Sequence, residues 1–141
     1  MSQYLIEPEV PGGFGKNTLG RFDVHPPIVE KLHLEFDGWQ GDDLLEAFPC
    51  FLVSEHLATA LVASKLSGYN LEAVELSTSD MFQELQSERC LPRFSWLQIM
   101  GHTDKDDFSV SEKGILLVSR KAMQLLQKFQ LTNADITVYK S

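Results

Sequence analysis

A short pattern of residues occurs twice in this chain, 65 residues apart, and it narrows the possible folds more than any other property of the sequence. Each copy is an apolar run that ends in serine, FLVS at 51–54 and LLVS at 116–119. A short apolar run is typical of a buried strand. Serine is a favoured N-cap residue, because its hydroxyl accepts a hydrogen bond from a free amide of the first helical turn. The pattern therefore predicts, twice, a strand that leads directly into a helix.

The residues after each serine match as well. The first predicted helix runs toward Gly68 and the second toward Asn133, again 65 residues apart, and both residue types favour the left-handed conformation at a helix end. A second apolar strand is expected after each helix, at 71–76 and 136–139. Strand, helix and strand at matched spacing indicate an internal repeat. The repeated β-α-β units are placed at 51–76 and 116–139.

The segments outside the repeat are less regular. Residues 1–27 are expected to be irregular, because proline and glycine recur too often for a long helix. A helix at 79–85 is expected to turn Met81, Phe82 and Leu85 inward. Three more elements are predicted: an alternating strand at 32–36, a short helix from Asp42 or Asp43 to Ala47, and a central strand at 94–100 with apolar residues on both faces.

These elements predict one α+β domain over residues 1–141. We expect a mixed β-sheet of about five or six strands with the two repeat helices packed on one face. An α/β arrangement is the alternative, since strand-helix-strand units often form parallel pairs. With 141 residues, 43% of them hydrophobic, the chain can bury a core without disulfides. Cys50 and Cys90 are expected to be free and buried.

The distribution of charge limits the classes of partner. The net charge is −8, but residues 32–88 hold 11 acidic residues and one basic residue, whereas the rest of the chain is slightly basic. Such a field repels phosphates and favours a basic protein partner over nucleic acid or an anionic membrane. A role in solubility alone is the other interpretation. The sequence shows neither a secretory signal nor an apolar span, so a cytoplasmic location is expected.

The motif search predicts no catalytic or metal site. The sequence contains no P-loop, dinucleotide fingerprint, HExxH, GxSxG or paired CxxC. The four histidines show no ligand spacing, and His33 and His56 are expected at the surface. The acidic run Asp104, Asp106 and Asp107 lacks the central glycine of a calcium loop and is expected to be a solvated turn. We therefore expect a binding protein without enzyme activity, cofactor or metal.

The loop around Trp39 is the strongest candidate for a binding site. Aromatic residues anchor protein interfaces, and neighbouring charges steer the partner. Helix capping by Asp42 or Asp43, and acid-base catalysis by the same pair, are the alternatives. The predicted partner-binding residues are Asp37, Trp39, Asp42, Asp43 and Glu46.

Four runs follow one another in the first half of the chain: HPPIV at 25–29, LHLEFDGW at 32–39, GDDLL at 41–45 and FPCFLVS at 48–54. Together they resemble an immunity-protein domain family of bacterial polymorphic-toxin systems, first catalogued as a domain of unknown function. Shorter stretches at 97–100, 106–108 and 117–119 are also similar, so the resemblance covers most of the chain from about Val24 onward.

The resemblance implies a cytosolic antidote that binds a cognate toxin and blocks it. It carries no catalytic residues. The acidic segment fits this function, because toxins that attack nucleic acids are often basic, and complementary charge speeds capture. A monomer or weak homodimer is expected. Two other classes stay open: a small hydrolase that uses Asp42 or Asp43, and a self-associating structural subunit.

Overall fold

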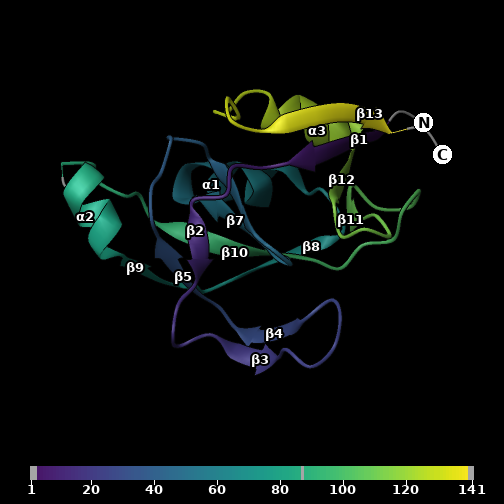
Figure 1. Ribbon diagram of the computed structural model, residues 1–141. Coiled ribbons are helices and arrows are strands. Elements are labelled where there is room, and N and C mark those ends of the chain that lie inside the picture. Colours follow the sequence, from purple (N-terminus) through teal and green to yellow (C-terminus); the bar gives the residue numbers. More distant parts are fainter. Residues whose placement is uncertain (1–2, 87, 140–141) are drawn as a thin grey trace.

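The computed structural model describes residues 3–86 and 88–139 and confirms the α+β class (Figure 1). Its strands are divided among several sheets, and each repeat helix lies against its own sheet. The first sheet has the order β11 (Phe108–Val110), β12 (Leu116–Ser119), β1 (Gln3–Glu7) and β13 (Asp135–Tyr139), with α3 (Arg120–Leu126) against β12 and β1. The second has the order β6 (Leu44–Ala47), β7 (Cys50–Ser54), β10 (Phe94–Ile99) and β8 (Tyr69–Glu72), with α1 (Glu55–Ser64) against β7 and β10.

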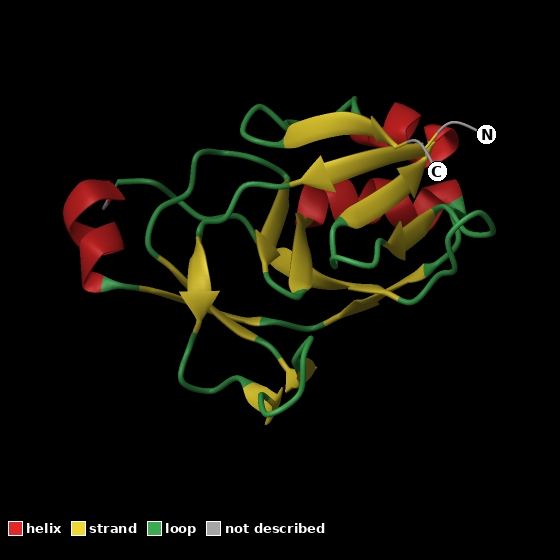
Figure 2. Cartoon of the chain, turned by 45° about the vertical axis from the view of Figure 1, so that its right-hand side comes forward, coloured by secondary structure: helices red, strands yellow, loops and turns green. Residues whose placement is uncertain are grey.

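Smaller elements extend these two layers (Figure 2). A third, mixed sheet has β5 (His33–Phe36) between antiparallel β2 (Gly12–Phe14) and parallel β9 (Glu75–Thr78). A two-stranded ribbon joins β3 (Leu19–Arg21) and β4 (Ile28–Lys31). The helix α2 (Asp80–Gln86) projects from one end of the molecule in both views (Figures 1 and 2). No helix of the described segments is long and apolar enough to cross a membrane.

The two four-stranded sheets are built in the same way, and each contains one strand from the other half of the chain. Strand β1 comes before β6 and β7 in sequence, yet it pairs with β12 and β13. Strand β10 comes before β11 and β12, yet it pairs with β7 and β8. The registers also agree. Ile6 of β1 lies opposite Ile136, and Leu97 of β10 lies opposite Leu71. The two partners, Leu71 and Ile136, are again 65 residues apart. Neither copy of the repeat completes its sheet alone, so the two copies form one packed unit.

The prediction that residues 1–27 are irregular is wrong, because β1, β2 and β3 fall within them. Proline and glycine exclude a long helix, but they allow short strands between them. Strand β1 lies between β12 and β13, and Ile6 is fully buried in the core under α3. This first strand is therefore a central part of the fold.

The prediction of a helix up to Ala47 is also wrong, because this stretch is the strand β6. Successive side chains of a strand point to opposite faces. Leu44 belongs to the core cluster on one face, and Leu45 belongs to the cluster on the other. Apolar contacts on both faces outweigh the capping potential of the preceding aspartates.

The helix ends and the strands that follow them differ in detail from the prediction. Helix α1 ends at Ser64 with Lys65 in the left-handed conformation (φ 61°), and Gly68 (φ 94°) lies in the turn before β8. Helix α3 ends at Leu126, well before Asn133. The strand expected at 71–76 is divided between β8 and β9, while the one expected at 136–139 corresponds to β13.

Strand β10 separates two hydrophobic clusters, as its two apolar faces predict. Leu97 packs in the cluster with α1 and α3, together with the partly buried Ile99. Phe94 and Trp96 pack in the second cluster, with β5 and the α2 residue Phe82. Burial raises the pKa of the Cys50 thiol to about 12. The expectation that Cys90 is also buried is wrong, because it is exposed.

Both predicted serine caps are confirmed. The Ser54 hydroxyl accepts a hydrogen bond from the Leu57 amide (3.2 Å), and the Ser119 hydroxyl accepts one from the Ala122 amide (3.1 Å). Each hydroxyl also donates to an aspartate at the start of its own hairpin: Ser54 to Asp43 (2.7 Å) and Ser119 to Asp107 (2.6 Å). The repeat thus includes an aspartate that holds each capping serine in place.

We expect Ser54→Ala and Ser119→Ala each to lower the free energy of unfolding by about 1 kcal/mol, because each removes a helix cap and leaves one carboxylate oxygen without its donor. The two losses should be similar, since the contacts are equivalent. Urea unfolding of both variants checks this. Thr132→Ala, at an exposed position after α3, is the control and should change the free energy of unfolding by less than about 0.5 kcal/mol. A loss in one cap variant at least twice the loss in the other would contradict equivalence.

Candidate partner-binding surface

The loop that carries the predicted binding residues connects β5 of the third sheet to β6 of the second. Trp39 is held at three points. Its backbone amide donates to the side-chain oxygen of Gln86 in α2 (2.8 Å), and its ring Nε1 donates to the carbonyl of Asp42 (3.0 Å). The Arg89 guanidinium carbon lies 5.4 Å from the centre of the Trp39 ring. Trp39 is therefore a half-buried anchor that joins α2 to the loop.

Asp42 has a structural role. Its side chain is fully buried, and its carboxylate accepts hydrogen bonds from the backbone amide (2.8 Å) and side-chain amide (3.1 Å) of Asn133. The Asp42 amide donates to Glu9 (3.2 Å), whose pKa is raised by burial and held down in part by hydrogen bonds from Gln40 and Asp42. Since Asp42 is enclosed by its own chain, it does not lie on a surface that a partner could touch.

Asp43 connects the two copies of the repeat. One carboxylate oxygen accepts from Ser54 in its own copy, and the other accepts from the Gln130 amide that follows α3 (2.8 Å). Asp107 repeats this arrangement, with Ser119 on one oxygen and the Ser67 amide that follows α1 on the other (2.9 Å). Neither aspartate needs a ligand to explain its position. The helix-capping interpretation of Asp42 and Asp43 is wrong, because the residues that follow them form strand β6.

The two remaining predicted residues differ in exposure. Glu46 on β6 is half-buried, and its pKa is raised by desolvation and then by the negative charge of Glu7. Asp37, at the end of β5, is exposed and lines an open hollow together with Val10 and Met81. Of the five residues, Asp37 is the one that stands fully at the surface.

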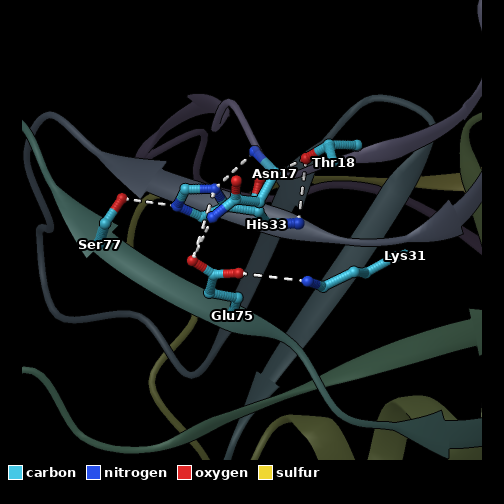
Figure 3. Close-up of polar contacts among 6 residues, drawn as sticks. All are labelled: Asn17, Thr18, Lys31, His33, Glu75 and Ser77. Atoms are coloured by element: carbon cyan, nitrogen blue, oxygen red, sulfur yellow. Dashed lines mark hydrogen bonds and ion pairs between the residues drawn. The ribbon is translucent and has the colours of Figure 1, made fainter.

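A second polar cluster lies around His33, which was expected at the surface and is buried instead (Figure 3). The Ser77 hydroxyl lies 2.7 Å from its Nε2, and the Glu75 carboxylate lies 3.9 Å from its Nδ1. Serine, histidine and glutamate in this order can form a nucleophilic site. Here the backbone amide of Asn17 donates to Nδ1 (3.1 Å), so Nδ1 is an acceptor. In a neutral imidazole the other nitrogen then carries the proton, and Nε2 donates to Ser77. A histidine in this state cannot remove the serine proton, and the cluster fastens the loop at 15–18 to the third sheet.

Helix α2 carries a surface that the sequence did not reveal. The expectation that Met81 and Leu85 point inward is wrong: Met81 is 54% and Leu85 is 73% exposed, and Phe82 alone of the three is buried. Residues four apart share a helix face, so the spacing of Met81 and Leu85 did indicate an apolar stripe. What it could not indicate was whether that stripe meets the core or the solvent.

Acidic side chains border this apolar stripe. Asp80 and Glu84 occupy the neighbouring face of α2, one helical turn apart. Glu88 lines an open hollow with Leu85, and Asp37 lines another with Met81. Arg89 is the basic residue beside them, and it lies over the Trp39 ring. The result is an apolar strip with a negative border.

Comparison with protein-family models finds no match, and neither does comparison with curated proteins. The relation to the immunity-protein family therefore stays a prediction from the residue pattern. Within 3–86 and 88–139, no group of three His, Cys, Asp or Glu side chains is placed to hold a metal ion.

Proposed function

We propose that this chain is an immunity protein that binds a basic cognate toxin in the cytoplasm and neutralises it by protein-protein interaction. The observation that carries the proposal is the free negative charge of residues 32–88. Among the described residues of this segment, Glu75 is the one carboxylate that forms an ion pair, with Lys31 outside the segment. A negative field that the chain does not neutralise internally favours a positively charged partner. The resemblance of the four residue runs supplies the class of that partner.

The roles of the candidate catalytic residues agree with a binding function. Asp42 and Asp43 hold the two copies of the repeat together, and the Ser77 hydroxyl faces a protonated ring nitrogen of His33. The hydrolase alternative would need one of these groups to be free for a substrate. Their hydrogen bonds instead give each group a structural explanation.

The direct test is to examine the gene directly upstream for a toxin domain and to co-express that domain with this chain. We expect the chain to restore growth of cells that produce the toxin and to form a stoichiometric complex with it in purified form. A catalytically inactive toxin variant serves for the binding measurement. If the complex does not form and growth is not restored, the proposed function is wrong.

The association rate should depend strongly on ionic strength. We expect the on-rate to fall by at least about tenfold between low salt and roughly 0.5 M salt, because salt screens the attraction between exposed charges. The off-rate should change much less, since steering acts on the encounter. Stopped-flow or surface-binding kinetics measure both rates. An on-rate independent of salt would remove electrostatic steering from the proposal.

A further inference from the structure

We propose that the apolar strip formed by Val10, Met81 and Leu85, with its acidic border, is the docking surface for a basic segment of the partner protein. This inference rests on the proposed function for the identity of the partner. In this proposal the element that contacts the partner is α2, and not the loop 39–43 that the sequence suggested.

The three faces of α2 differ in burial and in charge. On the first face, Phe82 is buried in the second hydrophobic cluster, and the Gln86 side chain accepts a hydrogen bond from the Trp39 backbone amide. These contacts fix the helix to the body of the protein. The next face presents Met81 and Leu85 to solvent. The third face carries Asp80 and Glu84. A helix that is anchored on one face is a rigid platform for what the other two present.

Val10 extends the apolar face beyond the helix. It is 66% exposed and lines the same hollow as Met81 and Asp37. Single exposed apolar residues are ordinary, but contiguous ones on a projecting element are typical of interaction sites. Methionine and leucine on a rigid helix suit the insertion of an apolar side chain from a partner.

The border determines what kind of partner fits. Within the described part of the chain, none of the four carboxylates around the strip, those of Asp37, Asp80, Glu84 and Glu88, forms an ion pair. A partner that covered the apolar strip with neutral or acidic groups would leave these charges desolvated and unpaired, which is costly. A segment with one or two apolar anchors flanked by Lys or Arg would cover the apolar strip, and its basic side chains would form ion pairs with the carboxylates of the border.

The test is a double substitution on the apolar face. Met81→Ala combined with Leu85→Ala should weaken binding of the inactive toxin by about a hundredfold, because two central apolar contacts are lost while the acidic border is unchanged. Both residues are exposed, so the thermal unfolding midpoint should stay close to that of the wild type. Isothermal titration gives the affinity, and thermal unfolding checks the fold.

Val62→Ala is the matched control. Val62 is 67% exposed on α1, outside the strip, and its substitution should change the affinity by less than about threefold. If the double variant binds the toxin as tightly as the wild type, the docking surface is wrong while the proposed function stands.

A second probe separates the two proposals if no toxin binds. A short amphipathic Leu/Lys peptide, added to isotopically labelled protein, should shift the amide resonances of α2, Val10 and Asp37. Its Leu/Glu counterpart should leave these resonances unchanged, since the border would repel it. Shifts confined to α2 and its border would support the surface even though the proposed function had failed. Shifts located elsewhere, or equal shifts with both peptides, would overturn it.

Discussion

Replacing Ile6 by alanine is expected to lower the free energy of unfolding by about 3 kcal/mol. Ile6 is fully buried in β1, opposite Leu116 on one side and Ile136 on the other, and it packs in the cluster under α3. Removing its side chain leaves a cavity in a central strand, where neighbouring strands on both sides limit relaxation. Urea unfolding, followed by circular dichroism, measures the loss.

The matched control is Leu19→Ala on β3. Leu19 also lies in the segment 1–27, but it is 57% exposed, so the loss should be within about 0.5 kcal/mol. Leu97→Ala, at the equivalent position of β10, should cost as much as Ile6→Ala. If Ile6→Ala and Leu19→Ala were equally mild, the placement of β1 in the centre of the first sheet would be wrong.

Replacing Asp42 by alanine is expected to lower the free energy of unfolding by about 2 kcal/mol. The substitution removes the acceptor for two hydrogen bonds from Asn133, and bonds to a charged group are stronger than average. Part of the loss is offset, because the negative charge of Asp42 also opposes ionisation of the nearby Glu9. Chemical unfolding of the purified variant gives the value.

Asp37→Ala is the control for charge alone. Asp37 is exposed, and its removal should change stability by less than about 0.5 kcal/mol. Asp42→Asn tests the hydrogen bonds separately, because the amide keeps the size of the side chain and replaces one acceptor by a donor. If Asp42→Ala were as stable as the wild type, the link between the loop and the segment after α3 would contribute nothing.

The parts of the fold that follow from neighbouring residues were predictable. A serine after an apolar run places its hydroxyl beside the amides of the next helical turn, whatever the rest of the chain does, and both caps formed as expected. Apolar residues at both alternating sets of positions in 94–100 require cover on both faces, and β10 has it.

The candidate site was predictable only in part. The spacing of Met81 and Leu85 defines a stripe on α2, but the same spacing serves a buried face and an exposed one. Phe82 and Gln86 turned out to face the body of the protein, which left the stripe in solvent. For Asp42, the adjacent residues suggested a helix cap, while its true partner is 91 residues away.

By itself, the sequence determined that this chain contains two equivalent strand-helix units with serine caps, because hydrogen bonds and side-chain alternation over a few residues are nearly independent of the remaining chain. Only the tertiary structure decided that the units exchange their central strands, that Asp42 and Asp43 tie the units together, and that one face of α2 stays open. The physical reason is that such pairings depend on which distant segments bury each other's apolar faces, and a local pattern is compatible with several of those choices.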